Sequence, residues 1–219
     1  MAVRGIDRRR FLGLVAAAGA GGVMVAASSK ASALGFDAER ETMLPPGAGW
    51  RLDPSRSDEF NGGLLHTAKW VGKGDVQVSD GLLRIRLGGD PSGQGPFHPG
   101  GVRSTFAVGG DTYTEVRAKV TGTDADADSV IRHSDADVQH IGRAGGPLDE
   151  DFHFYGLERR AGKVVFHIDG EPYRSHRAQA VTEPQPLAMY VRAINETGRI
   201  NAEALPMDLF VGHVRVYTA

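Results

Sequence analysis

The sequence predicts an all-β protein built as a sandwich of two antiparallel sheets. Three observations lead to this prediction. Short segments alternate between polar and apolar side chains, glycine and proline residues separate these segments, and nothing after residue 33 shows a convincing helical period. Strict alternation places one face of a strand against a core and the other toward solvent. Many short strands punctuated by turn residues favour two stacked sheets.

Five segments are expected to form strands, and strict alternation is clearest at 113–120. They are residues 75–87 (a hairpin with its turn at 79–81), 113–120, 163–168, 187–194 and 209–217. The dipeptide Asp169-Gly170 is a strong turn signal after one of them. Residues 88–101 form a long polar loop, and loops of that length in compact domains are often functional.

The N-terminus has the pattern of an export signal. A basic stretch, Arg8-Arg9-Arg10, is followed by Phe11-Leu12, a small-residue apolar run and the end Ala31-Ser32-Ala33. This pattern predicts a cleavable twin-arginine signal, because the apolar run is shorter than the roughly 20 residues of a membrane-spanning helix. We expect an export signal at 1–33, a linker or N-terminal arm at 34–50 and one domain at 51–219. The mature protein would then be extracellular, periplasmic or associated with the cell wall.

Composition excludes several classes of partner and site. The chain has no cysteine, so it has neither disulfides nor thiolate metal sites. Its 25 Lys and Arg residues nearly balance its 27 Asp and Glu residues, and no basic run follows the signal. We therefore expect no nucleic acid and no anionic membrane as partner. An anionic polysaccharide would have to be bound by local arginines.

Six motifs in order along the chain resemble glycoside hydrolase family 16. They are Ser57–Gly62 with Lys69-Trp70, Gly101–Ser104, Tyr113–Lys119, Asp151–Glu158, Phe166–Gly170 and Val211–Tyr217. The resemblance implies a concanavalin A-like jelly-roll β-sandwich. It also implies an ancestry among retaining enzymes that cut β-linked polysaccharides such as β-glucans, agars and carrageenans.

The family's catalytic strand reads E-x-D-x-E, and the matching positions here are Asp135, Asp137 and Gln139. We expect these three side chains to share one face of a strand, since successive residues of a strand point to opposite sides. The family's second glutamate is the general acid and base, but the amide of Gln139 cannot protonate a leaving group. Losing that help costs a factor of roughly a hundred to ten thousand. A bulged alignment instead deletes the glutamate before His140.

Other candidate site residues come from the same resemblance. His153 aligns with a family histidine and is a candidate replacement acid or base. Expected substrate-binding residues are Arg103, Tyr113, Glu115, Arg117, His140 and Tyr155. Tyr190 and Phe97 are further candidates for a sugar-stacking platform, whereas Trp70 is expected in the core.

Several family features are missing. Residues 123–134, which in the family carry aromatic subsite residues, contain none here, and the family tryptophan after the Phe-His motif is Arg159. The aspartate that helps to hold a structural calcium ion in the family is Gly212. We therefore expect no metal and no cofactor, and a solvated turn rather than a calcium loop at 124–128.

These observations leave three functional hypotheses. The first is an exported monomer that binds a polysaccharide or cell-envelope glycan with weak or no hydrolysis. The second is a divergent endo-acting glycosyl hydrolase that uses Asp135 or Asp137 with His153 or water. The third is a structural jelly roll without a ligand, in which Asp135, Asp137 and Gln139 line a solvated strand face.

Overall fold

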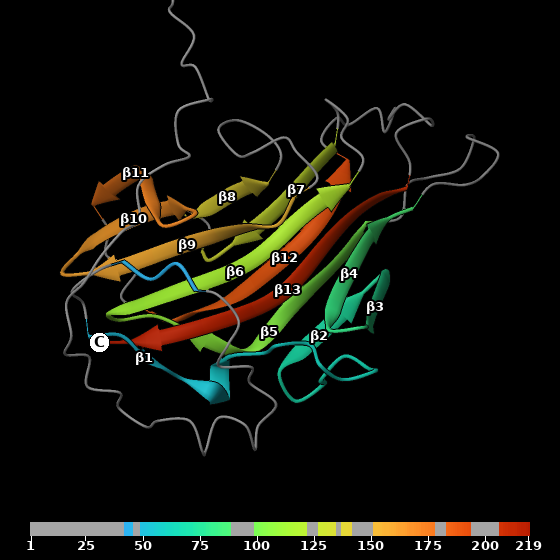
Figure 1. Ribbon diagram of the computed structural model, residues 1–219, viewed down its shortest axis with the longest axis horizontal. Coiled ribbons are helices and arrows are strands. Elements are labelled where there is room, and N and C mark those ends of the chain that lie inside the picture. Colours follow the sequence, from blue (N-terminus) through green and yellow to red (C-terminus); the bar gives the residue numbers. More distant parts are fainter. Residues whose placement is uncertain are drawn as a thin grey trace, which may run out of the picture.

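The computed structural model describes residues 42–45, 49–88, 99–121, 127–134, 137–141, 151–177, 183–193 and 206–219. Within these residues the chain forms two antiparallel sheets stacked as a sandwich (Figure 1). The predicted all-β jelly-roll sandwich is thus confirmed. The expected export signal, Phe97, Asp135 and residues 122–126 lie outside the described residues.

The larger sheet has eight strands in the order β11-β10-β9-β6-β13-β4-β3, and β1 pairs with β13. Its strands are β1 (Arg51–Leu52), β3 (Asp75–Ser79), β4 (Leu82–Leu87), β6 (Thr112–Thr121), β9 (His153–Arg160), β10 (Lys163–Ile168), β11 (Glu171–Arg177) and β13 (Met207–Thr218). A single turn of 3-10 helix, η2 (Pro54–Arg56), follows β1.

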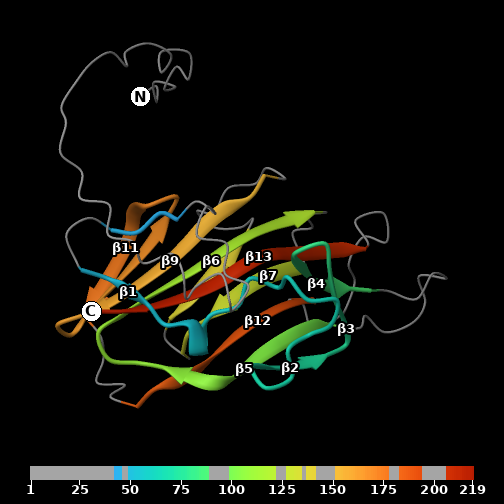
Figure 2. The ribbon, with the colours of Figure 1, turned by 60° about the horizontal axis from the view of Figure 1, so that its bottom comes forward.

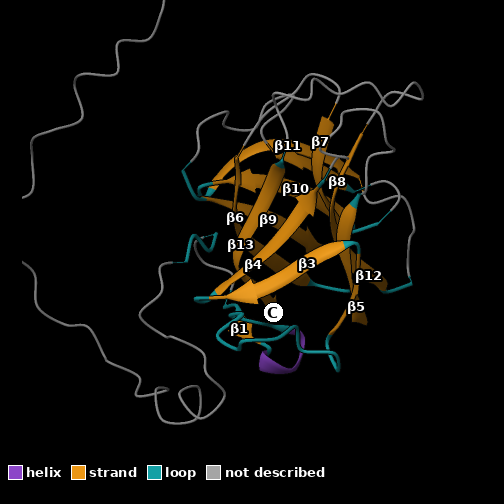
Figure 3. Cartoon of the chain, turned by 90° about the vertical axis from the view of Figure 1, so that its right-hand side faces the viewer, coloured by secondary structure: helices purple, strands orange, loops and turns teal. Residues whose placement is uncertain are grey.

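The smaller sheet has five strands in the order β2-β5-β12-β7-β8. They are β2 (Trp70–Lys73), β5 (Gly100–Val108), β7 (Ala127–Arg132), β8 (Val138–Ile141) and β12 (Gln185–Ala193). Figure 2 shows β5 and β12 on one side of the sandwich with β6, β9 and β13 on the other. The view in Figure 3 looks along the layers from one end. Each sheet therefore has an inner face in the core and an outer face.

Two of the predicted turns form as the sequence indicates. Asp80 and Gly81, between β3 and β4, have φ of 53° and 74°, and Asp169 and Gly170 have φ of 51° and 80°. Two successive residues with positive φ match the right-handed twist of the strands that they join. Aspartate and glycine tolerate this conformation, which explains why these dipeptides end the strands.

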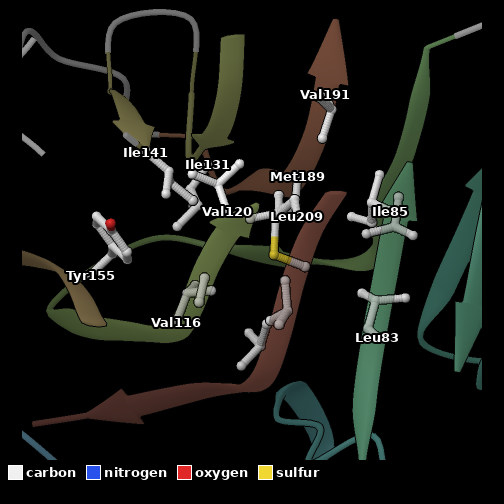
Figure 4. Packing of buried hydrophobic residues seen from close by; sticks show 14 of the residues in the cluster. Leu83, Ile85, Val116, Val120, Ile131, Ile141, Tyr155, Met189, Val191 and Leu209 are labelled. Atoms are coloured by element: carbon white, nitrogen blue, oxygen red, sulfur yellow. The ribbon is translucent and has the colours of Figure 1, made fainter. Parts of the chain in front are cut away.

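The core lies between the two sheets. Leu83, Ile85, Val116, Val120 and Leu209 of the larger sheet meet Ile131, Met189 and Val191 of the smaller one (Figure 4). Trp70 is 1% exposed, which confirms its predicted place in the core. Burial of this apolar surface is the main source of stability in a chain without disulfides.

The first and last family-like motifs are joined in the fold. The Trp70 indole donates to Asp58 Oδ2 at 2.9 Å, and Arg215 Nε of β13 donates to Glu59 Oε1 at 2.7 Å. Glu59 and Arg215 are both buried. These motif residues therefore hold the segment before β2 against the final strand, which is a structural role.

Candidate functional site

Strand β8 forms a hairpin with β7 at one edge of the five-stranded sheet. The His133 backbone N–H donates to the Asp137 carbonyl at 2.9 Å across the turn. The register pairs Gln139 with Ile131 and His140 with Val130. The strand begins at Val138, so Asp137 precedes it, whereas we expected Asp137 within the strand.

Gln139 points into the sandwich, which corrects the predicted strand face. Gln139 and Ile141 are 1% and 2% exposed, and Ile141 belongs to the core. The Gln139 amide donates to the backbone oxygens of Gly156 at 3.3 Å and His167 at 3.4 Å. The segment 138–141 has one apolar residue on each face, and the core takes Ile141, which fixes the register with Gln139 inward.

Asp137 is also buried, and its carboxylate is held by three side chains. Arg159 Nη2 of β9 donates to Oδ2 at 2.5 Å, His176 Nε2 of β11 lies 3.0 Å from Oδ1, and Ser134 Oγ donates to Oδ2 at 2.8 Å. The prediction that Asp137 lies on an exposed strand face is therefore wrong, because its carboxylate points toward the eight-stranded sheet.

A further contact completes this arrangement. Arg174 Nη2 of β11 donates to the Val138 carbonyl at 2.9 Å. We refer to Asp137, Gln139, Arg159, Arg174 and His176 as the inter-sheet latch. The latch joins the β7–β8 hairpin of one sheet to β9, β10 and β11 of the other.

His133 is part of the same buried surroundings. Its Nε2 lies 3.3 Å from Gln139 Oε1, which accepts a hydrogen bond from the neutral ring. Burial, followed by the nearby positive charge of Arg159, lowers the pKa of His133 to about 4. The imidazole is therefore uncharged at neutral pH.

Two predicted substrate-binding residues, Tyr113 and Glu115, lie on the outer face of the eight-stranded sheet and are covered. Thr42 Oγ1 and the Met43 N–H donate to the Glu115 carboxylate at 2.9 Å and 2.8 Å. The Tyr113 hydroxyl donates to the Met43 carbonyl at 3.2 Å, and burial raises the pKa of Tyr113. The buried His213 donates to the same carboxylate at 3.2 Å. These side chains secure residues 42 and 43 to the sheet.

Arg117 lies on this same outer face, beside Gly212 of β13. Its guanidinium lies 4.0 Å from the centre of the Phe152 ring. A Cβ atom at position 212 would be 2.8 Å from Arg117 Nη1. The glycine at the position of the family's calcium aspartate therefore leaves room for this arginine.

The remaining candidates, His153 and Tyr155, belong to β9 of the eight-stranded sheet and not to the sheet that contains β8. His153 Nδ1 lies 2.7 Å from Asp169 Oδ2, which ties the start of β9 to the turn after β10. Tyr155 is 1% exposed and part of the core, so its predicted contact with substrate is wrong.

Arg103 and His140, two of the predicted binding residues, share the outer face of the five-stranded sheet, although β5 and β8 are three strands apart. Cross-strand pairing defines two rows of residues from β8 to β2 on this face. The first is His140, Val130, Tyr190, Gly101 and Lys73, and the second is Val138, Arg132, Ala188, Arg103 and Val71. We refer to these two rows without Val130, which is fully buried, and together with Arg192, as the outer-face site.

Tyr190 is the aromatic residue near the centre of this site. It is half-buried, and the Arg192 guanidinium lies 5.3 Å from its ring centre. A Cβ atom at position 101 would lie 3.0 Å from Tyr190 Cβ. Because Gly101 has no Cβ, no side chain projects from this position beside Tyr190. The arrangement offers one ring with guanidinium groups around it, which suits a ligand with an apolar face and polar substituents.

Comparisons with known proteins address the fold. No family model matches the sequence, and no curated protein matches it. Among solved structures, the chain is similar to an endo-β-1,3-glucanase from Pyrococcus furiosus, with 16% identity, a TM-score of 0.60, and coverage of 77% of this chain and 94% of that one. A β-glucanase from Bacillus licheniformis shares 16% identity with a TM-score of 0.57 over 74% and 97% of the two chains.

A family 16 glycosyl hydrolase from Mycobacterium smegmatis also matches, at 16% identity and a TM-score of 0.57, over 73% of this chain and 98% of that one. The chain has the glycoside hydrolase family 16 fold. At this identity the likeness concerns the architecture alone.

Within this family 16 fold, the sequence did not single out Arg132 or Arg192 as site residues. Strand alternation could have identified them, because it places Ala188 and Arg192 on the same face as Tyr190. It likewise places Val130 on the same face as Arg132. The predicted exposed face with Asp137 and Gln139 has the opposite parity from the face of β8 that is turned away from the core.

Two other features are missing from the described residues. No cluster of three or more His, Cys, Asp or Glu side chains suitable for a metal ion occurs among them. No helix in the described part of the chain has the length and apolar character needed to cross a membrane.

Proposed function

We propose that this protein binds a polysaccharide on the outer-face site and does not cut it by the retaining mechanism of family 16. One observation carries the proposal. Strand β8, which contains Gln139 of the segment that resembles the family's catalytic motif, directs Val138 and His140 outward and Gln139 inward. The carboxylate of Asp137 is engaged in the inter-sheet latch.

The chemistry of retention supports the absence of hydrolysis. Retaining cleavage needs two carboxyl groups about 5–5.5 Å apart on either side of the glycosidic bond. The four residues of β8 include none, and Asp137 is only 4% exposed. A carboxylate that already accepts from Arg159 and Ser134 inside the sandwich has no access to a sugar.

The outer-face site supports binding. Sugars are held by an aromatic platform with a few polar groups around it. Tyr190 supplies the ring, and Arg103, Arg132 and Arg192 supply hydrogen-bond donors on the same face. The partner is then a polysaccharide or cell-envelope glycan, which agrees with the export signal expected at residues 1–33. We place the protein outside the cytoplasm, as a monomer.

Affinity electrophoresis in gels containing mixed-linkage β-glucan, agar or carrageenan tests the proposal. Tyr190→Ala should weaken retardation by about tenfold in Kd, because loss of a central aromatic residue commonly costs more than 1 kcal/mol. Tyr173→Ala is the matched control, since Tyr173 is 44% exposed on β11 of the other sheet. No retardation on any glycan, or equal loss in both variants, would overturn the proposed function.

A further inference from the structure

Cationic side chains are concentrated on the outer-face site. Arg103, Arg132 and Arg192 are exposed there, and Lys73 is exposed at the end of the first row. The whole chain carries a formal charge of −2, so the concentration of positive charge on this face is a local feature. The inference rests on Arg103, Arg132 and Lys73, which come from the three strands β5, β7 and β2 of this sheet.

Arg103 and Arg132 stand in the same row with a small residue between them. Ala188 of β12 pairs with Arg103 on one side and with Arg132 on the other. Neighbouring strands are about 4.8 Å apart, so the two Cα atoms are separated by about 10 Å. The methyl group of Ala188 leaves the space between the two arginines open to a ligand.

Tyr190 lies one row away from these arginines. Its strand neighbour Gly101 connects the ring to Lys73 across β5, while Arg103 is two residues further along β5. An extended chain lying across β12 at Tyr190 would meet Arg103 and Lys73 toward β2 and Arg132 toward β8. Guanidinium groups bind carboxylates and sulfate-like oxyanions through paired N–H donors.

We propose that the ligand of the outer-face site is an acidic polysaccharide, one that bears carboxylate or sulfate groups on its sugars. This inference rests on the proposed function and specifies its substrate class. Tyr190 stacks on a sugar ring, and Arg103 and Arg132 bind acidic substituents about two strands apart. Lys73 extends the positive charge toward the edge strand β2.

The test uses glycan pairs that share a backbone and differ in charge. Carboxymethyl cellulose and cellulose sulfate are compared with hydroxyethyl cellulose, and carrageenan is compared with agarose, in affinity gels at low and high salt. The expected result is at least tenfold tighter binding of the acidic member of a pair in low salt. The difference should collapse in about 1 M salt, where the Debye length falls to about 3 Å.

The double variant Arg103→Gln/Arg132→Gln should weaken binding of the acidic glycan by about 2- to 30-fold and leave neutral glycans within twofold, since an exposed ion pair contributes about 0.2–1 kcal/mol. Lys163→Gln/Arg177→Gln is the control, because these exposed cations form a cross-strand pair on the other sheet. It removes the same charge and should change nothing.

The possible failures are distinct. If neutral and acidic members bind equally on both backbones, with a Tyr190→Ala loss, the acidic-glycan inference falls and the proposed function stands. If no glycan binds, both fall. If duplex DNA or phosphatidylserine vesicles bind more tightly than every acidic glycan, with the same dependence on Arg103 and Arg132, the inference falls in favour of that partner.

Discussion

The Arg159 guanidinium lies 2.5 Å from the Asp137 carboxylate, and the two side chains are only 11% and 6% exposed. Arg159 belongs to the eight-stranded sheet, whereas Asp137 precedes β8 of the five-stranded sheet. The two side chains thus form a buried ion pair between the two sheets. The pair gives the Asp137 carboxylate a structural role.

Asp137→Asn should lower the free energy of unfolding by about 3–5 kcal/mol. The substitution removes the negative charge but leaves the Arg159 guanidinium buried, and a buried charge without its partner is strongly destabilising. Urea unfolding monitored by tryptophan fluorescence measures the change.

A double-mutant cycle with Arg159→Met supplies the control for the Asp137 prediction. The double variant Asp137→Asn/Arg159→Met has lost both the carboxylate and the guanidinium charge. It should therefore be more stable than Asp137→Asn alone, which buries an unpaired guanidinium. Additive losses of unfolding free energy in the cycle would show that Asp137 and Arg159 are not energetically coupled. That result would contradict the ion pair in the structure.

His133 should make the protein less stable in mild acid. Its pKa is about 4 in the folded chain against an ordinary value of 6.5, so the unfolded chain takes up a proton in this range and the folded chain does not. The contribution is fully present above pH 6.5 and is lost as the pH falls toward 4. It amounts to about 2 kcal/mol between about pH 7 and about pH 5.

His133→Gln isolates this contribution, because glutamine does not titrate. Urea unfolding at several pH values should give a shallower pH dependence for the variant than for the wild type in the same window. Parallel curves for the two proteins would mean that His133 titrates normally in the folded chain.

Gly156→Ala should destabilise the fold by about 1–3 kcal/mol through overpacking. A Cβ at this position of β9 would overlap the Tyr113 hydroxyl and lie 2.7 Å from the ring carbon that bears it. Gly63→Ala is the matched control, because nothing lies within 4 Å of a Cβ there. Thermal unfolding should separate the two variants, and equal melting temperatures would contradict the packing of Tyr113 on Gly156.

Much of the fold could be predicted from local signals. Lys163–Ile168 is rich in β-branched and aromatic residues and ends at a turn dipeptide, and the strand has those bounds. Trp70 was expected in the core because of its place in the opening motif, and it is there. In these cases the local pattern and the tertiary fold favour the same conformation.

The orientation of β8 could not be predicted in the same way. The segment Val138-Gln139-His140-Ile141 has a polar and an apolar residue on each face, so its alternation does not decide which side is buried. Arg159 and His176, which satisfy the buried Asp137, come from strands 22 and 39 residues further along the chain. Only the tertiary structure shows that these side chains meet.

The sequence could not predict which residues cover Tyr113 and Glu115, for a similar reason. Strict alternation on β6 correctly placed both on one face, but did not indicate what lies on that face. Thr42 and Met43, more than 70 residues earlier, bind the Glu115 carboxylate. Alternation predicts which residues share a face of a sheet and not which segment covers it.

The release of reducing ends from a polysaccharide that the protein retains in affinity gels tests most directly whether this fold binds without cutting. We expect no more release than heat-denatured protein gives over a long incubation, because β8 carries no carboxylate and Asp137 is held by Arg159. Steady release by the native protein, abolished in a folded Asp135→Ala variant, would contradict the account and assign the protein to the active glycosyl hydrolases.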